Sequence, residues 1–311
     1  MLKLRTAIQT LGHTQDLKDG SLKPQGFAFE FEEVPAIIQA FRRMVRASEF
    51  DISEMAMTTY LCARAHGKRF TALPIFLVRA FHHGAILHNT TLGIRHPKDL
   101  EGRRVGVNRG YTVTTGVWAR GVLQHEHGVD LAKITWVLSG DEHVAEYRGP
   151  ANVVALEKGK KLEDMLASGE IAAATGLTLE HPDVSPLIPN AKAAGFAALK
   201  SSGYYPINHT LVVRDELLEA HPGLALEIFE VFAAAKRRYV ERLKHIAEPS
   251  ATDKRYQEVM EITGADPLPY GLAPNRKMME MVIRLAGEQG IVAHPHTVDE
   301  LFARGTHELV G

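Results

Sequence analysis

Hydrophobic and polar residues alternate along the N-terminal part of the chain in patterns that predict strands and helices in turn. The segment from Lys3 to Thr10 alternates apolar and polar positions, as a half-buried strand does, and FAFEFEEV predicts a second strand. A short buried strand, EFDI, is expected after one intervening helix. That helix is predicted by apolar residues at helical spacing, at Ile37, Ile38, Phe41, Met44 and Val45.

The middle of the chain continues this alternation. Ser53 and Glu54 are expected to open a helix, EMAMTTYLCARAHG, which ends at Gly67, and ALPIFLV and AFHHGAILH are expected to be extended. After a loop, RGYTVTT, the pattern predicts a helix at GVWARGVLQHEHGV and a strand at ITWVLS. A strand-like run, a helix at LEDMLASG and a strand at IAAATG come next, and FAALKSSGYYPINHTLVVR predicts an extended return.

The C-terminal part, after Arg214, predicts helices only. They are expected at Pro222–Ile246, at about Asp253–Ile262 and at Asn275–Gln289, with a final helix from Thr297 that begins with a capping box to Glu300. These helices have no sheet of their own, so we expect them to pack on the N-terminal sheet.

Strands that alternate with helices indicate an α/β fold in which mostly parallel sheets are flanked by helices. We predict two lobes: a discontinuous lobe of residues 1–88 plus 207–311, and an inserted lobe of residues 89–206. Two chain crossings would join them, one after AFHHGAILH and the other at YYPINHT. A ligand cleft is expected between the lobes, and turns at the carboxyl ends of the strands would face it.

The amino-acid composition excludes several classes of function. The 311 residues are 45% hydrophobic with a formal net charge of −1, so no basic excess directs the protein to nucleic acid or to an anionic membrane. The single cysteine, Cys62, excludes an intrachain disulfide and a cysteine-rich metal site. We find no signal peptide and no apolar run near the ~20 residues that span a bilayer. These features predict a cytoplasmic protein, with a homo-oligomer left open.

Two strand-to-helix turns carry hydroxyl groups. In FDISEMAMTTY, Thr58 and Thr59 lie one turn after the expected helix start, and ordinary helix capping explains this turn equally well. In VGVNRGYTVTTGVW, free backbone N–H groups beside Thr112 and Thr114 form a candidate anion site. No phosphate loop, dinucleotide fingerprint or GxSxG motif is present.

The stretch RAFHHG, residues 79–84, combines a carboxylate-binding residue with two residues that transfer protons near neutral pH. In an extended segment His82 and His83 would point to opposite faces, and no carboxylate has the spacing to complete a metal site with them. His209 opens the strand at the other crossing. A surface ion pair for Arg79 and structural hydrogen bonds for the histidines are the alternatives to a functional role.

These motifs together resemble the 4,5-dihydroxyphthalate decarboxylase family. The likeness covers FDISEMAMTTY, LPIFLVRAFHHGAI, PKDLEGRRVGV with TVTTGVWARGVLQHEHGVD, and YPINHTLVVRDELLEAHP, in the same order. It implies the type II periplasmic-binding-protein-like fold of the nitrate-, sulfonate- and thiamine-precursor-binding proteins. It also implies a cytoplasmic lyase that needs no cofactor and converts a dihydroxylated benzene dicarboxylate, the small-molecule partner, to protocatechuate and carbon dioxide.

The resemblance assigns roles to residues of this chain. A proton must reach the ring carbon that bears the carboxylate, and His83 or His209 would donate it. Arg79 would bind a carboxylate, while His82 and His13 would shape the pocket. The other expected substrate-binding residues are Glu54, Thr58, Thr59, Tyr111, Thr112, Val113, Thr114, Arg120 and Tyr205.

The chain departs from the family pattern at two places. Family members have Tyr-Asp-Arg shortly after the first strand, where this chain reads LGHTQDL, and arginine where this chain has His82. Two fewer cations favour an aromatic or heteroaromatic acid with fewer carboxylates. Two alternatives remain: a solute-binding protein for a small aromatic or sulfonate-like anion, and a histidine that is consumed in a single turnover.

Overall fold

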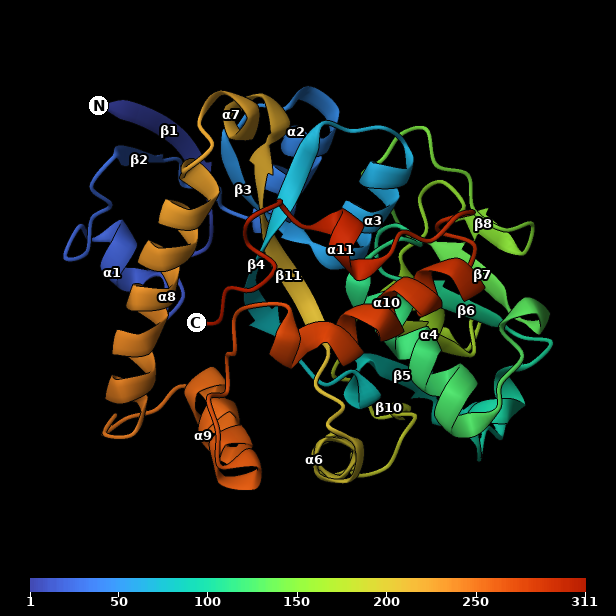
Figure 1. Cartoon of the computed structure of the whole chain (residues 1–311). Helices are drawn as coiled ribbons and strands as arrows, with labels where there is room; N and C mark the ends of the chain where they lie inside the picture. Colours follow the sequence, from blue (N-terminus) through green and yellow to red (C-terminus); the bar gives the residue numbers. More distant parts are fainter. The chain divides into compact units, whose positions relative to one another are not determined.

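The computed structural model describes all residues from 1 to 311, which form two compact units. Unit 1 comprises Met1–Arg79, Ile207–Ile283 and His296–Gly311, and unit 2 comprises Ala80–Pro206 and Arg284–Pro295. Each unit is built on one β-sheet that carries helices (Figure 1). None of the helices combines the length and the apolar character that crossing a membrane requires.

The sheet of unit 1 has five strands, and four of them run in the same direction. In spatial order they are β2 (Phe27–Phe31), β1 (Leu2–Ala7), β3 (Ile52–Ala56), β11 (Ile207–Arg214) and β4 (Phe70–Arg79). β1 pairs in parallel with β2 and β3, whereas β11 is antiparallel to both β3 and β4. The return strand β11 therefore starts at the edge where the other strands end.

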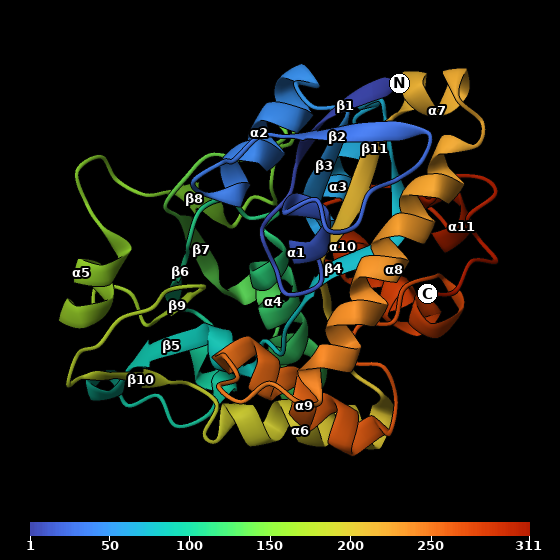
Figure 2. The same cartoon turned by 90° about the vertical axis from the view of Figure 1, so that its left-hand side faces the viewer.

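Successive side chains of β4 face opposite sides of the sheet, and each side is covered by other parts of unit 1. Leu73, Ile75 and Leu77 belong to a buried apolar cluster with α8 (Leu224–Leu243), which lies along one face of the sheet (Figure 2). On the opposite face, the backbone N–H of Ala72 donates to the hydroxyl of Tyr60 at 3.1 Å, and Phe76 packs edge-on against Phe302. β4 is the edge strand of the sheet, and these contacts bury it on both faces.

The helices of unit 1 follow the predicted order, except for α1, which was not predicted. They are α1 (Gln15–Lys18), α2 (Ile37–Ala47), α3 (Met57–Ala65), α7 (Asp215–Ala220), α8, α9 (Ala251–Thr263), α10 (Arg276–Glu288, in unit 1 up to Ile283) and α11 (Val298–Leu301). The capping box between Thr297 and Glu300 is confirmed, since each side chain bonds the other residue's backbone N–H. The packing of α8 on the first sheet is also confirmed.

The sheet of unit 2 has six strands, and only β5 runs against the others. In spatial order they are β10 (Val184–Pro186), β5 (Ile86–Asn89), β9 (Ala173–Thr175), β6 (Arg104–Val107), β7 (Thr135–Leu138) and β8 (Val153–Ala155). Both sheets are thus mostly parallel, with one strand reversed in each.

Two helices enclose the sheet of unit 2. The helix α5 (Leu162–Ser168) joins an apolar cluster with Val137 and Ala174. The helix α4 (Thr114–His127) places Gly116 against Val107, within 3.8 Å of where a Cβ would lie. The third helix of this unit is α6 (Ala191–Ser202). Short 3₁₀ turns occur at His83–Ala85, Thr90–Leu92, Pro97–Leu100 and Leu131–Lys133 in unit 2 and at Ala273–Asn275 in unit 1.

Three local predictions are wrong. Ser53 and Glu54 lie inside β3 and do not open a helix, because ladders to β1 and β11 hold them and α3 starts only at Met57. Residues 82–85 form a 3₁₀ turn, so the two histidines are not on opposite faces of a strand. Phe196–Ser202, expected to be extended, belongs to α6, where an alanine-rich composition favours the helix.

The unit boundaries also differ from the expected lobes. Residues 80–88 fall in unit 2, because β5 pairs with β9 and β10 of the second sheet. Residues 284–295 join unit 2 as well, although they come from the C-terminal helices. Several hydrogen bonds hold them there: for example, Gln289 accepts from Arg120 at 2.8 Å, and the carbonyl of Gly290 accepts from the Tyr147 hydroxyl at 3.2 Å.

The buried face of α8 should dominate the stability of unit 1. Phe232 is fully buried in the apolar cluster, so Phe232→Ala is expected to lower the free energy of unfolding by about 3–5 kcal/mol. Leu226 lies on the same helix but is 42% exposed, and Leu226→Ala should change stability by no more than about 0.5 kcal/mol. Urea unfolding followed by circular dichroism measures both; equal losses would contradict this packing.

Candidate functional site

Polar side chains collect at one edge of the unit 1 sheet because several strands end there. Glu54 lies in β3, Arg79 is the last residue of β4, and Gln9 follows β1. His209 joins them because the antiparallel strand β11 begins at the edge where the parallel strands finish; it is opposite Ala56. The pairing of β11 with β4 is irregular from Ile207 to Leu211, and such bulges reorient side chains.

Glu54 is the centre of a hydrogen-bond network at this edge. Its side chain is fully buried, and its Oε1 accepts from Nδ1 of His209 at 2.6 Å. Gln9 donates twice, from its backbone N–H to Oε2 at 2.9 Å and from its side-chain amide to Oε1 at 2.7 Å. Phe41 of α2 packs edge-on against the His209 ring, with ring centroids 5.0 Å apart. The carboxylate and the phenylalanine together fix the orientation of this imidazole.

The environment of Glu54 favours its charged form. Burial by itself would raise the pKa of Glu54, but the hydrogen bond and charge of His209 and the two bonds from Gln9 outweigh burial, so the net pKa is lowered. Because Nδ1 faces the carboxylate, Nε2 of His209 is the nitrogen left for another partner. The side chain is 19% exposed, so the ring also reaches the surface of the unit. A carboxylate-oriented imidazole of this kind can donate or accept a proton.

His13 lies in the loop after β1 and has unusual surroundings. It is 1% exposed, yet neither ring nitrogen makes a hydrogen bond of normal geometry. Burial lowers the pKa of His13 from 6.5 to about 4, and the charge of Lys236 acts in the same direction. The Glu54 carboxylate and the Leu77 backbone oppose this shift without cancelling it. His13 is therefore neutral at pH 7, within electrostatic range of Glu54.

Arg79 is a buried cation of the same unit. It is 2% exposed, and its guanidinium donates a short hydrogen bond to the side-chain carbonyl of Asn275 and lies 5.7 Å from the Phe76 ring centroid. Burial raises the pKa of both Tyr256 and Tyr270, and the nearby charge of Arg79 counteracts part of that rise. The structure thus places Arg79 in the interior of unit 1, near Asn275, Tyr256 and Tyr270.

Two of the residues predicted to bind substrate lie in the packed interior of unit 1. Thr58 and Thr59 follow the first residue of α3 and are fully buried. Neither caps the helix, because the residue at the N-cap is Ala56 and no side chain makes a capping bond there. These threonines remain predicted substrate-binding residues on the strength of the sequence alone.

Unit 2 holds both histidines of RAFHHG. Nε2 of His83 lies 3.1 Å from both carboxylate oxygens of Glu126 on α4, and its ring meets Tyr204 edge-on with centroids 5.9 Å apart. Nδ1 of His83 is buried without a hydrogen-bond partner. His82 precedes the 3₁₀ turn and is 3% exposed. Tyr205, 6% exposed, packs against Phe81 with centroids 5.4 Å apart.

The predicted anion-binding turn before α4 does bind a carboxylate, which belongs to Glu142. The backbone N–H groups of Tyr111 and Thr112 donate to Glu142 at 2.5 and 3.2 Å, and the Thr112 hydroxyl donates at 2.6 Å. Gly110 permits this approach, since a Cβ there would overlap the Glu142 carboxylate. Consecutive N–H groups that converge on one carboxylate form an anion-binding nest. Val113 and Thr114 continue the chain into the helix.

Arg120 supports this turn from inside unit 2. The side chain is fully buried, and it donates from Nε to Gln289 at 2.8 Å and from a terminal nitrogen to the carbonyl of Tyr111 at 2.6 Å. Its guanidinium carbon lies 3.8 Å from the centroid of the Tyr111 ring, and burial lowers its pKa. The guanidinium therefore contacts Tyr111 twice, at its backbone carbonyl and at one face of its ring.

Sequence reasoning missed several polar residues at these edges. Gln9, Glu142 and Arg109 belong to no recognisable sequence motif. Arg109 has a left-handed backbone conformation (φ 74°), which is rare outside glycine. A cavity of about 60 Å³ lies beside the start of α4 and is lined by Val107, Asn108, Arg109, Val113, Thr115, Gly116, Thr175 and Gly176. No three histidine, cysteine, aspartate or glutamate side chains cluster in a way that could hold a metal ion.

Known proteins resemble the chain in sequence. A 4,5-dihydroxyphthalate decarboxylase of Comamonas testosteroni is 27% identical over 321 residues, which cover 97% of this chain and 96% of the relative. A 4,5-dihydroxyphthalate decarboxylase of Pseudomonas putida is 32% identical over 209 residues, which cover 62% of this chain and 80% of the relative. The chain belongs to the 4,5-dihydroxyphthalate decarboxylase family. No protein-family profile matches it.

Solved structures place this decarboxylase-family chain in a wider fold. The alkanesulfonate-binding protein SsuA from Xanthomonas axonopodis pv. citri, bound to MOPS, aligns with a TM-score of 0.51 at 16% identity over 97% of this chain and 98% of that protein. A mutant of the desulfurization enzyme DSZB in complex with biphenyl-2-sulfinic acid aligns with 0.54 at 15% identity over 98% of both chains. A Candida albicans protein with the generic periplasmic binding protein fold aligns with 0.55 at 16% identity over 100% and 99%. The type II periplasmic-binding-protein-like fold is thereby confirmed.

Within this 4,5-dihydroxyphthalate decarboxylase family member, His13 should make stability depend on pH. The unfolded chain binds a proton on His13 below about pH 6.5, whereas the folded chain resists protonation down to about pH 4. Between these values the unfolded state holds more protons, so stability falls as the pH falls, by up to about 3 kcal/mol. Urea unfolding of wild type and His13→Leu from pH 7.5 to pH 4.5 should show this decline in wild type only.

The exposed His294 provides the matched control. His294→Leu should follow the wild-type curve over the whole range of pH. If His13→Leu loses stability in parallel with wild type, His13 is not held neutral by the fold and the assignment is wrong.

Proposed function

We propose that this protein decarboxylates a hydroxylated aromatic acid such as 4,5-dihydroxyphthalate, without a cofactor, by protonation of a ring carbon. The observation that carries the proposal is the Glu54–His209 pair at the strand edge of unit 1, in a chain that belongs to a decarboxylase family. The relatives named above carry this activity in their names. The fold by itself supports no particular reaction, since binding proteins and enzymes share it.

The reaction requires one proton at one carbon. A hydroxyl para to the reacting carbon donates electron density into the ring, so that the carbon bearing the carboxylate can accept a proton from the imidazolium of His209. The bond from that carbon to the carboxylate then breaks, its electron pair restores the aromatic ring, and carbon dioxide leaves. The product carries the proton, and solvent returns one to His209. Each turnover consumes one proton and needs no oxidant or reductant.

Glu54 has a positioning role in this scheme. Its carboxylate accepts from Nδ1 of His209, which directs Nε2 outward and stabilises the imidazolium that donates the proton. Gln9 in turn holds Glu54 through two hydrogen bonds. The fixed tautomer and the partial exposure of His209 favour it as the donor over His83, whose Nε2 is directed at Glu126.

Carboxylate binding is proposed for Arg79 in unit 1 and for the turn Tyr111–Thr114 in unit 2. The turn's ability to hold a carboxylate is supported by Glu142, which occupies its N–H groups and its threonine hydroxyl. Arg120 would act on substrate only through Tyr111. Glu54, Thr58, Thr59, Tyr205, His82 and His13 complete the proposed surroundings of the substrate. A neutral His13 supports the expectation of a substrate with fewer carboxylates than a phthalate.

Release of carbon dioxide tests this function directly. We expect the purified, EDTA-treated protein to release carbon dioxide from at least one acid in a panel of hydroxylated benzoates and phthalates, with one proton taken up per turnover. Thermal stabilisation by one of these acids without any release would identify a binding protein and overturn the enzymatic proposal. Release from 4,5-dihydroxyphthalate itself would identify the substrate of the named relatives as the substrate of this chain.

The proton donor is tested by matched histidine variants. His209→Asn is expected to lower kcat by about 10²-fold or more, because a positioned general acid contributes that much. His83→Asn should lower kcat by less than about tenfold, and Glu54→Gln should lower kcat while the dissociation constant of the substrate changes little. A large loss of kcat in His83→Asn with normal activity of His209→Asn would transfer the donor role to His83.

A further inference from the structure

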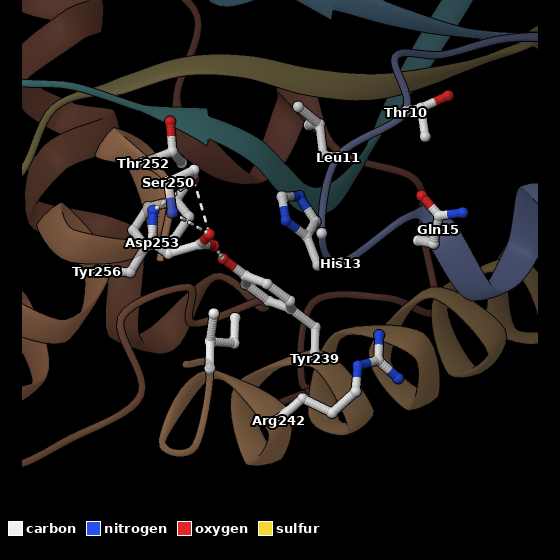
Figure 3. A pocket seen from close by; sticks show the side chains of 12 residues that line it. Thr10, Leu11, His13, Gln15, Tyr239, Arg242, Ser250, Thr252, Asp253 and Tyr256 are labelled. Carbon is white, nitrogen blue, oxygen red and sulfur yellow. Dashed lines mark hydrogen bonds between the residues drawn. The ribbon is translucent and has the colours of Figure 1, made fainter. Parts of the chain in front are cut away.

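A cavity of about 420 Å³ in unit 1, beside the loop after β1, has charged side chains in its lining that bond within the chain (Figure 3). Asp253 accepts a short hydrogen bond from the Tyr239 hydroxyl and a bond from the Ser250 hydroxyl at 2.7 Å. Arg242 donates to both carboxylate oxygens of Asp16, at 3.1 and 2.9 Å. Hydrogen-bonding groups without such partners occur elsewhere in unit 1, in the backbone at the outer edge of β2.

β2 is an edge strand of the unit 1 sheet, and only one of its two sides is paired (Figure 1). The backbone N–H of Glu32, directly after the strand, donates to the carbonyl of Thr6 in β1 at 2.9 Å. Because the backbone groups of successive residues in a strand point to opposite sides, Ala28 and Glu30 also face β1. The other residues of the strand turn their N–H and C=O groups away from the sheet: Phe27, Phe29 and Phe31.

The outward backbone groups of these three phenylalanines have no hydrogen-bond partner within the chain. Soluble proteins usually protect such an edge with proline, lysine, a bulge or a covering segment. β2 contains no proline or lysine, and its register with β1 is regular. Its one charged residue, Glu30, bonds to Lys3 at 2.7 Å, and both side chains are more than half exposed. An unprotected edge of this kind is a template for pairing with another strand.

The three phenylalanines also place a row of aromatic rings along this edge. Their side chains belong to the apolar cluster that α8 covers. Phe29 packs edge-on against Phe27 and stacks with Phe31, with ring centroids 4.9 and 5.1 Å apart. Phe27 is buried, but Phe29 and Phe31 are only half-buried. The apolar surface that remains exposed on these two rings is available to the side chains of an added strand.

We propose that two copies of the chain pair their β2 strands antiparallel, about a two-fold axis beside Phe29. Phe29 exchanges both backbone hydrogen bonds with the partner's Phe29, and Phe27 does so with the partner's Phe31. Every outward N–H and C=O of the edge then has a partner. The two five-stranded sheets become one continuous sheet, through the self-complementary contact that two-fold symmetry requires.

Charge and existing hydrogen bonds select this register. It places Glu30 opposite the partner's Ala28, so that no two carboxylates face each other. The next register toward the C-terminus would set Glu30 against the partner's Glu30, and like charges directly opposite are destabilising. The next register toward the N-terminus would need the backbone N–H of Gln25, which already donates to Glu227 at 2.8 Å.

Charge variants on the solvent face of β2 test this register. We expect wild type to sediment as a dimer, with twice the 34.3 kDa of one chain. Ala28→Glu places a carboxylate opposite the partner's Glu30 at both ends of the contact, and should weaken the dimer by about tenfold or more. Ala28→Gln has the same length without the charge, and as the matched control it should dimerise like wild type. Combining Ala28→Glu with Glu30→Lys turns both repulsions into attractions and should restore the dimer.

Amide hydrogen exchange identifies the surface independently of mass. In the wild-type dimer the N–H groups of Phe29 and Phe31 should be protected, and Ala28→Glu should expose them at the same protein concentration. The N–H groups of Ala28 and Glu30 should stay protected in both proteins, because β1 pairs with β2 within each chain.

Three results would overturn the proposal: a chain that stays monomeric up to its solubility limit, a dimer in which Phe29 and Phe31 exchange freely, or a dimer that Ala28→Glu leaves intact. If circular dichroism shows that Ala28→Glu folds poorly, the exchange pattern of wild type still decides. Protection that appears only when a different protein is added would assign the edge to that partner and refute the symmetric dimer. Carbon dioxide release enters none of these measurements, so the outcome is independent of the proposed function.

Discussion

Burial of the Glu54 carboxylate is the constraint around which the strand edge of unit 1 is organised. A buried charge is costly unless hydrogen bonds and an opposite charge compensate it. Gln9 and His209 provide this compensation, and together they lower the pKa of Glu54 despite its burial. His209 reaches the carboxylate only because β11 is antiparallel and starts at this edge. The reversed strand is therefore what links the topology of the sheet to its chemistry.

Unit 2 satisfies its buried charges in another way. Arg120 is fully buried, but it donates to an amide oxygen and a backbone carbonyl and lies against aromatic faces, and none of these partners is a carboxylate. Glu142 is held by backbone N–H groups and a hydroxyl of the turn before α4. Both arrangements converge on Tyr111, which Arg120 contacts from the interior while Glu142 accepts from its N–H. The turn before α4 is thus a carboxylate site, and Glu142 occupies it.

His13 contrasts with all of these groups. Glu54, Arg120 and Glu142 are held by several hydrogen bonds, whereas burial lowers the pKa of His13. The fold therefore keeps His13 neutral at pH 7, beside a cavity.

The sequence by itself determined the alternation of strands and helices, the fold class and the family, because periodicity and motif order are local properties. It also identified the turn before α4, since glycine, threonines and a helix start suffice to predict an anion site. Tertiary structure decided that Ser53 and Glu54 lie in a strand, because ladder partners from β1 and β11 outweigh a capping preference. It also decided that Glu142 fills the turn and that Gln9 supports Glu54. Those contacts join residues 30 and 45 positions apart, and no local pattern encodes them.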